Sequence, residues 1–232
     1  MSLDFSKEFY QPKGEPMLDL NMFPERQYRI LAVIERIRGQ GGEEYQGSGS
    51  TEHKSRRNPV REDTAPLLQA YAALLKPRQI FEMGTAYGFS TLHLGLGSSQ
   101  SRIITVEFET DVASEAQANL DEAGLEAFVF HGTAESAIRT TVPKPDLVFM
   151  DHDKGSYLKD FQLLEPRLVP GALILADNVN DRRSECADFV DYMFAKYPDT
   201  EILATECGLL VARVPSFSPS TASVREAAYV EA

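Results

Sequence analysis

Cysteine is scarce in this sequence, tryptophan is absent, and no long apolar run occurs. Cys186 and Cys207 are the only cysteines, too few for a disulfide framework or a cysteine-based zinc site, so both are expected to be reduced thiols. No apolar stretch approaches the ~20 residues that a bilayer-spanning helix needs. The N-terminus MSLDFSKEFYQPKGEPMLDL lacks a basic segment followed by an apolar one, so no secretory signal is expected. These absences favour a cytoplasmic protein that does not bind a membrane.

Basic residues are also in short supply. Lys and Arg together number 23 against 35 Asp and Glu, which gives a formal net charge of −12. A field of that sign repels phosphate backbones and anionic membrane surfaces, so nucleic acid is not expected as a partner. The one basic cluster, from His53 to Arg57, lies in a stretch rich in Gly and Ser and is interpreted as a solvated loop rather than a binding patch.

The length of 232 residues fits one large domain better than two small ones. We predict an extended N-terminal arm over residues 1–21, a single domain over residues 22–214 and a flexible Ser- and Ala-rich tail over residues 215–232. Within the domain, residues 22–76 are expected to form a helical cover and residues 77–214 the core. A monomer and a homodimer are both compatible with the sequence.

Two helices are expected in this cover. Apolar residues recur at helical spacing from Tyr28 to Ile37, and the glycines from Gly39 onward are expected to end that helix and begin a flexible connection. A second helix is expected at about residues 65–75, with Asp63 or Thr64 as its N-cap.

From residue 79 onward, short apolar runs alternate with longer segments of helical character. The runs that are typical of strands are QIFEMG, RIITVEF, AFVFHG, DLVFMDH, ALILADNV, TEILATE and LLVARV. Apolar strands that alternate with helices predict a doubly wound α/β domain, with a mostly parallel seven-stranded sheet covered by helices on both faces. Gly208 separates the last two runs, so they are expected to pair as an antiparallel hairpin at one edge.

Ligands of a doubly wound sheet bind beyond the carboxyl ends of the strands, where this chain is unusually polar. After the first run, Gly84 and Gly88 stand four apart rather than in the GxGxxG pattern of a dinucleotide site. Such a turn lets a small nucleoside approach the backbone, although a tight turn that needs positive φ explains the glycines equally well. Glu107 ends the second run, where a carboxylate can accept hydrogen bonds from a ribose diol, and a solvated strand-end Glu is the alternative. Ala134 and Glu135 follow the third run, where an adenine edge could lie.

Oxygen-bearing side chains follow the fourth and fifth runs. Asp151 ends one of these strands, and Asp177 and Asn178 end the other, so the three side chains converge if the strands are neighbours. Two carboxylates and an amide oxygen suit a hard divalent cation, and Mg²⁺ is the expected one. Ordinary turn formers and a helix N-cap with a local ion pair are the alternative interpretations. The occurrence of both motifs at matching strand ends favours the cation site.

Lys154 lies three residues beyond Asp151 and is expected to begin the next helix inside the same crevice. An amine beside a cation and its bound hydroxyl can act as a general base, so Lys154 is the predicted catalytic residue. A surface ion pair with Asp151 or Asp153 is the alternative.

Together these motifs resemble the cation-dependent O-methyltransferases that use S-adenosylmethionine, and most of all the catechol O-methyltransferases, over about residues 62–214. The resemblance lies in FEMGTAYGFS, VEF, GTAES, MDHDKGSY and LADNV. It implies a Rossmann-like class I methyltransferase fold, a divalent cation (Mg²⁺ or another) on Asp151, Asp177 and Asn178, and Lys154 as the base. The residues implied to contact S-adenosylmethionine are Glu82, Gly84, Thr85, Ser90, Glu107, Phe108, Ala134, Glu135, Asp151 and His152.

The resemblance also implies a catechol-like small-molecule substrate, whose adjacent hydroxyls bind the cation while one of them attacks the sulfonium methyl in line. Two departures leave other vicinal-diol acceptors and caffeoyl-type esters open. Asp153 stands where catechol O-methyltransferases carry an aromatic residue, and the segment TEILATECGLL is shorter than theirs. A non-catalytic protein that binds S-adenosylmethionine is the alternative from another class, whereas the glycine spacing disfavours a nucleotide-binding oxidoreductase.

Overall fold

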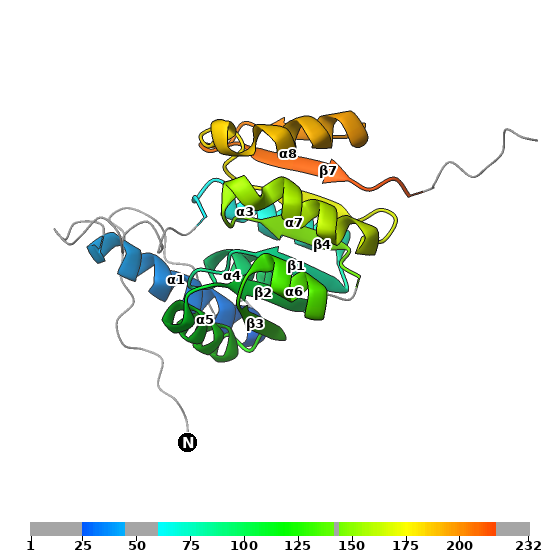
Figure 1. The fold of residues 1–232 in the computed structure, drawn as a ribbon. Coiled ribbons are helices and arrows are strands. Elements are labelled where there is room, and N and C mark those ends of the chain that lie inside the picture. Colours follow the sequence, from blue (N-terminus) through cyan, green and yellow to red (C-terminus); the bar gives the residue numbers. More distant parts are fainter. Residues whose placement is uncertain (1–24, 45–59, 142–143, 217–232) are drawn as a thin grey trace, which may run out of the picture.

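The computed structural model describes residues 25–44, 60–141 and 144–216, and its centre is one seven-stranded sheet with the order β3-β2-β1-β4-β5-β7-β6 (Figure 1). The strands are Gln79–Met83 (β1), Arg102–Glu107 (β2), Ala127–His131 (β3), Leu147–Met150 (β4), Leu173–Ala176 (β5), Glu201–Leu203 (β6) and Leu209–Arg213 (β7). β1 to β5 pair in parallel, and β7 pairs antiparallel with both β5 and β6. Each strand lies within one predicted run, and the predicted fold class and edge hairpin are confirmed.

Helices cover both faces of the sheet. They are Glu25–Glu44 (α1), Ala65–Leu75 (α3), Phe89–Gly97 (α4), Thr110–Glu122 (α5), Ala134–Thr140 (α6), Tyr157–Leu164 (α7) and Arg183–Lys196 (α8), with short 3-10 helices at Lys154–Ser156 (η3) and Glu165–Arg167 (η4). One core joins the sheet to α1, α3, α4 and α5, and a second core joins it to α6, α7 and α8.

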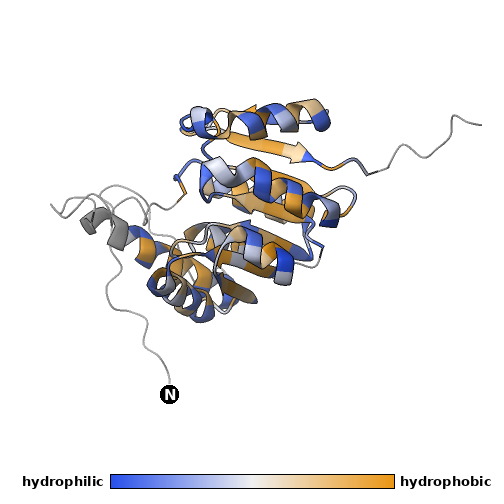
Figure 2. Cartoon of the chain, in the orientation of Figure 1, coloured by the Kyte–Doolittle hydropathy of each residue, from blue (hydrophilic) through white to orange (hydrophobic). Residues whose placement is uncertain are grey.

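Alternate residues of the central strands supply the two cores. In β4, Leu147 and Phe149 belong to the first core, while Val148 and Met150 belong to the second. All four are fully buried, as a parallel strand between two helical layers requires. The strands are accordingly apolar along their length, whereas the helices carry polar residues on their outer faces (Figure 2).

The predicted end of the first helix is wrong. α1 continues through Gly39 to Glu44 instead of ending at the glycine. Ile30, Val33 and Ile34 are buried in the first core and anchor this helix. Once a helix is anchored, each added residue costs only its own propensity, about 1 kcal/mol for each glycine, so the glycines Gly39, Gly41 and Gly42 weaken the last turns of α1 without ending it.

The predicted side-chain cap of α3 is also wrong, although the helix begins where expected. Thr64 has φ −82° and ψ −41°, which are already helical, and its side chain makes no capping hydrogen bond. The Asp63 carboxylate instead accepts a hydrogen bond from the backbone N–H of Glu206, 2.6 Å away, in the connection between β6 and β7. That connection comprises residues 204–208 and is longer than Gly208 alone.

Several predictions fall on residues that the structure does not describe. The arm over residues 1–21, the basic cluster from His53 to Arg57 and nearly all of the tail over residues 215–232 lie outside the described ranges, so the domain boundaries remain predictions. Cys186 and Cys207 are described, and both are buried free thiols. Among the helices of the described ranges, none combines the length and the apolar character that crossing a bilayer demands.

Candidate active site

The order of the strands reverses between β1 and β4, which is where a doubly wound sheet opens a binding crevice. The loops that follow these two strands touch there. The backbone N–H of Asp151 donates to Met83 O at 2.8 Å, and a Cβ on Gly84 would lie 2.6 Å from Asp151 O. Gly84 also has φ +99°, in the left-handed region. Only glycine therefore allows the two loops to approach this closely.

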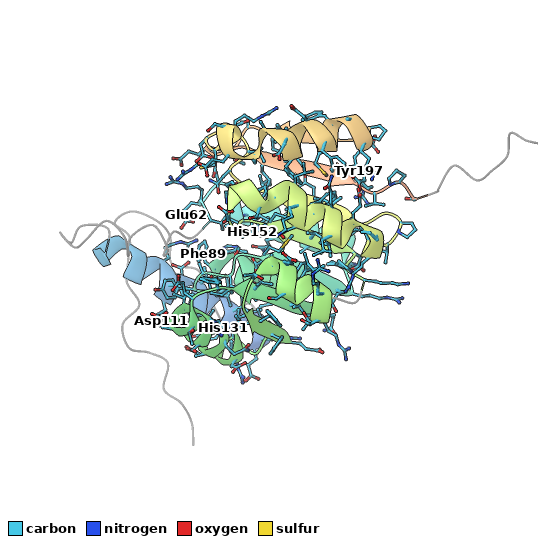
Figure 3. All side chains as sticks on the ribbon, viewed as in Figure 1. Glu62, Phe89, Asp111, His131, His152 and Tyr197 are labelled. Atoms are coloured by element: carbon cyan, nitrogen blue, oxygen red, sulfur yellow. The ribbon has the colours of Figure 1, made fainter. Side chains whose placement is uncertain are left out.

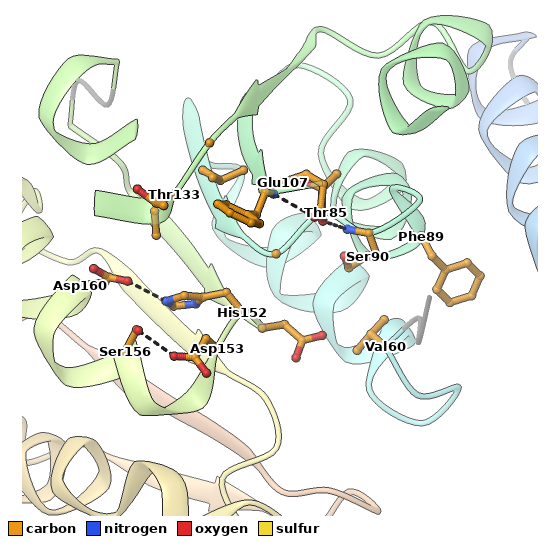
Figure 4. A pocket seen from close by; sticks show the side chains of 17 residues that line it. Val60, Thr85, Phe89, Ser90, Glu107, Thr133, His152, Asp153, Ser156 and Asp160 are labelled. Carbon is orange, nitrogen blue, oxygen red and sulfur yellow. Dashed lines mark hydrogen bonds and ion pairs between the residues drawn. The ribbon is translucent and has the colours of Figure 1, made fainter. Parts of the chain in front are cut away.

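A pocket of about 360 Å³ occupies this crevice, a size typical of small-molecule sites (Figure 4). Most of the predicted cofactor-binding residues line it, namely Gly84, Thr85, Ser90, Glu107, Phe108, Ala134, Asp151 and His152. Glu82 and Glu135 do not belong to the lining. The structure thus brings together residues from the ends of four strands that lie far apart in the sequence.

Glu82 lies behind the pocket wall and is fully buried. Its carboxylate accepts hydrogen bonds from Ser90 Oγ at 2.6 Å and from Thr91 Oγ1. Burial raises the pKa of Glu82 to about 7, and these hydrogen bonds oppose the shift. Glu82 therefore holds the first turn of α4, and through it Ser90, against the pocket.

Glu135 is engaged in ion pairs outside the pocket lining. Its carboxylate lies 3.1 Å from Nη2 of Arg139 on the same helix and 2.5 Å from Nζ of Lys159 on α7. The hydrogen bond from Lys159, followed by that from Arg139, lowers the pKa of Glu135. Thr133 and Ala134, which precede it, line the pocket instead.

The Glu107 carboxylate is fixed by the backbone around it. Oε2 accepts a hydrogen bond from the N–H of Ala86 at 2.9 Å, and Oε1 accepts from the N–H groups of Phe108 and Glu109 at 2.9 and 3.0 Å. An ionised carboxylate has about four acceptor sites, so this one is held in place and still has capacity for a ligand hydroxyl.

Asp151 and Asp177 meet at the ends of the neighbouring strands β4 and β5. The register pairs Met150 with Ala176, and the N–H of Asp177 donates to Met150 O at 3.0 Å. Burial, followed by the charge of Asp151, raises the pKa of Asp177 to about 7. Oδ1 of Asp177 is buried and has no hydrogen-bond partner among the residues that the structure describes. An orphaned carboxylate oxygen beside a second carboxylate is a site that attracts a cation.

Asn178 is the third predicted ligand and occupies a strained turn. Its φ is +62°, a conformation that Asn tolerates better than most residues, and its Nδ2 donates to Oδ2 of Asp181 at 3.4 Å. Within the described ranges, no three His, Cys, Asp or Glu side chains are grouped to hold a metal ion. The predicted set has only two carboxylates, so it fits a hard cation only if Asn178 supplies an amide oxygen.

Lys154 begins η3 and points its amine at this corner. Nζ lies 2.7 Å from Oδ1 of Asp151 and 3.0 Å from the carbonyl oxygen of His152, and it stands 5.2 Å from the centre of the Tyr157 ring. Lys154 and Asp151 do form an ion pair. The pair is buried rather than exposed at the surface, since the Lys154 side chain is only 11% exposed. Lys154, Asp177 and Asn178 do not belong to the pocket lining, which Asp151 joins, so the roles predicted for these three residues stay predictions.

Sequence reasoning missed part of the lining. Val60, Phe89, Thr133, Asp153, Ser156 and Asp160 all line the pocket (Figure 4). Ser156 lies within MDHDKGSY and Asp160 follows it one helical turn later, so a helical projection from Ser156 onward would have found Asp160. Val60 follows a long stretch without periodicity, and no signal in the sequence points to it. Figure 3 shows the side chains of the described residues on the ribbon and labels Phe89 and His152.

Comparison with known proteins agrees with this geometry. Residues 81–179 match the family model described as a methyltransferase domain. A catechol O-methyltransferase of Niastella koreensis is 33% identical over 127 residues, which cover 52% of this chain and 58% of the relative. A catechol O-methyltransferase of Mycobacterium tuberculosis is 36% identical over 112 residues, covering 47% of this chain and 51% of the relative. The chain therefore spans little more than half the length of these curated relatives.

Among solved structures, an O-methyltransferase from Bacillus cereus in complex with SAH (S-adenosylhomocysteine) superimposes with a TM-score of 0.65. The match covers 79% of this chain and 90% of the other at 22% identity, and it shows the class I methyltransferase fold. Residues 81–179 are thus similar to a methyltransferase domain, and about half of the chain is similar to catechol O-methyltransferases.

Proposed function

We propose that this chain transfers the methyl group of S-adenosylmethionine to a hydroxyl of a catechol-like small molecule, with the help of a divalent cation. The observation that carries the proposal is the buried pair of Asp151 and Asp177 at the edge of the pocket, with Oδ1 of Asp177 unpartnered and Lys154 alongside. The names of the matched relatives support the reaction class, because they are catechol O-methyltransferases. The SAH in the Bacillus cereus neighbour supports the cofactor.

Different residues of the pocket are proposed to bind different parts of the cofactor. Gly84 lines the pocket and has no side chain, so a ligand can approach its backbone there. Ser90, held by Glu82, is positioned for the methionine part. The fixed carboxylate of Glu107 is positioned to accept from the ribose hydroxyls, and the exposed ring of Phe108 beside it offers a face to the base.

Asp151, Asp177 and Asn178 would hold the cation. When bound there, Mg²⁺ supplies two positions to neighbouring acceptor oxygens and lowers the pKa of the hydroxyl that is to be methylated. The chain contributes the charge of two carboxylates, of which Asp177 is almost completely buried, so that the site excludes bulk water from one side.

Lys154 is the proposed base. Its bonds to Asp151 Oδ1 and the carbonyl oxygen of His152 hold Nζ beside the carboxylate pair. There the amine, once it has lost its own proton, can receive a proton from an acceptor hydroxyl. The Tyr157 hydroxyl donates to Met150 O at 2.8 Å and to Asp177 O at 3.2 Å, which ties the two strand ends under the amine. The residues of the corner are thus fixed relative to one another before a substrate arrives.

The direct test is release of SAH from S-adenosylmethionine and catechol, with excess EDTA and again after Mg²⁺ is restored. Turnover that stops in EDTA and returns with Mg²⁺ supports the proposal. Full activity in EDTA rules out the cation, and no turnover on any catechol-like acceptor, despite binding of SAH, favours a non-catalytic binding protein. Phenol and guaiacol serve as matched acceptors, and we expect neither to react because neither offers two free neighbouring hydroxyls.

A further inference from the structure

A buried carboxylate in the pocket has no part in the reaction proposed above. Asp160, in the first turn of α7, lines the pocket and is only 5% exposed. It lies with Thr133 at the end of the pocket opposite Val60 and Phe89, and the Glu107 position falls between the two ends (Figure 4). A ligand whose ribose is held at Glu107 therefore has its base at the Asp160 end.

Glu135, the residue expected to lie beside the adenine base, forms ion pairs outside the pocket. Its carboxylate is bound by Arg139 and Lys159, and it does not line the pocket. Asp160 is the acidic side chain that the fold supplies to this end of the lining instead. The two residues come from successive helices, α6 and α7, so a search along the third strand alone would not find Asp160.

The Asp160 carboxylate is already oriented. Oδ2 lies 3.0 Å from Nε2 of His152, and the His152 ring stacks on Tyr157 with centroids 5.0 Å apart and an interplanar angle of 29°. With the carboxylate ionised, Nε2–H donates to Oδ2, which leaves the lone pairs of Oδ1 as further acceptors. A buried carboxylate oxygen is costly unless a donor reaches it, so this one suits a ligand N–H.

We infer that Asp160 is the residue that selects adenine, by accepting a hydrogen bond from the exocyclic amine of the S-adenosylmethionine base; this inference rests on the function proposed above. A base that presents an oxygen at the same position would place one acceptor against another and leave Oδ1 of Asp160 without a donor from the ligand. Discrimination between an N–H and a carbonyl is then a property of this one side chain.

The test uses SAH and S-inosylhomocysteine, in which a carbonyl oxygen on the same ring carbon replaces that exocyclic amine. Each is titrated calorimetrically into the full chain without acceptor, so the readout is binding rather than turnover. We expect the wild type to prefer SAH by about 10- to 100-fold, the scale of a hydrogen bond to a charged group. Asp160→Asn should reduce the preference to within about threefold, because a carboxamide can donate to the oxygen as well as accept from the amine.

The matched control is Glu135→Gln, which should keep the wild-type preference. The ratio of the two affinities is decisive because a general disturbance of the fold or of His152 weakens both ligands alike. Asp160→Ser, whose hydroxyl also both donates and accepts, carries the same expectation if the Asn variant does not fold.

The outcomes separate the inference from the proposed function. A wild type that binds no SAH overturns the proposed function. A wild type that binds both ligands equally, or an Asp160 variant that keeps the wild-type preference, overturns the inference and leaves Asp160 as a partner of His152 alone, while the proposed function stands.

Discussion

Two carboxylates at strand ends, Glu107 and Asp177, face opposite situations in the same crevice. Glu107 accepts three backbone hydrogen bonds from the chain itself. Asp177 is buried, has a pKa raised to about 7 by that burial and by Asp151, and keeps one oxygen without a partner. The protein itself supplies hydrogen-bond donors to the Glu107 carboxylate. The Asp177 corner instead combines the carboxylates of Asp151 and Asp177 with the single amine of Lys154, so it has one negative charge in excess when all three groups are ionised.

This contrast teaches how the two sites are built. A carboxylate whose acceptors are filled in advance is rigid and can position a neutral diol. A pair of buried carboxylates stays unfavourable until a cation neutralises it, so its free energy depends on what binds. The predictions below test whether the two corners differ in this way.

The largest effect should come from the cation corner. Asp151→Ala and Asp177→Ala should each lower turnover by about 10³-fold or more, because the hydroxyl would lose several kcal/mol of stabilisation in the transition state. Binding of SAH should remain largely intact, since the cation is proposed to hold the acceptor and not the sulfonium. Steady-state rates at saturating cofactor, together with calorimetry, measure the two properties separately.

Asp146→Asn is the matched control for this prediction. Asp146 precedes the other end of β4, and its carboxylate accepts from the N–H groups of Arg78 and Gln79. Its replacement should change stability but not turnover in the folded fraction. Turnover that falls equally in Asp146→Asn and Asp177→Ala would remove the distinction between the two ends of the sheet.

The next effect should come from the amine beside that corner. Lys154→Met should lower turnover by about 10²- to 10⁴-fold with little change in SAH affinity, because proton transfer by a placed base contributes on this scale. Partial recovery at higher pH is expected as hydroxide takes over from the amine. Lys159→Met, which removes an exposed lysine bound to Glu135, is the control and should remain active. A Lys154→Met variant with wild-type rates at all pH values would leave Lys154 only its ion pair.

A smaller effect is expected from the replacement of Glu107. Glu107→Ala should weaken SAH binding by ~1.5 to 3 kcal/mol, the scale of hydrogen bonds to a charged acceptor. It should also lower stability, because the N–H groups of Ala86, Phe108 and Glu109 lose their acceptor. Titration calorimetry and thermal unfolding report these two changes. Unchanged affinity would remove Glu107 from the cofactor site.

The same contrast explains how far the sequence could lead. Apolar runs such as DLVFMDH predict strands such as β4, because a short segment that is apolar on both faces is typical of a strand inside a parallel sheet. Once the strand is predicted, the residue that follows its end is also known. The expectation that Asp151 lies near Asp177 depended only on strand order. Glu135 could not be separated from Asp160 in this way, because no local pattern encodes the tertiary contacts that direct their side chains. Glu135 pairs with Lys159 on α7, and Asp160 contacts His152 in the connection after β4. Val60 could not be predicted as a pocket residue for a related reason, because its position depends on tertiary contacts alone.

The smallest effect concerns stability in the absence of a cation. The folded-state pKa of Asp177 is raised from its ordinary value of 3.8 to about 7, so the folded protein binds a proton more tightly there than the unfolded chain does. The associated stability is fully present below about pH 4 and is lost as the pH rises through about 7. Metal-free wild type should therefore lose stability over this interval relative to Asp177→Asn, which carries no charge. The raised pKa of Glu82 acts in the same direction in both proteins and cancels in the comparison.

Thermal unfolding in EDTA measures this difference directly. We expect the Tm of Asp177→Asn to exceed that of the wild type by a few degrees at about pH 8, on the order of 1 to 3 kcal/mol, and by almost nothing at about pH 4. Mg²⁺ should raise the wild-type Tm at the higher pH and leave the variant nearly unchanged, because only the charged corner gains from the cation. A Tm difference that is the same at both pH values would mean that the charge of Asp177 does not destabilise the folded protein. The Asp177 carboxylate would then be as well satisfied by the protein as the Glu107 carboxylate.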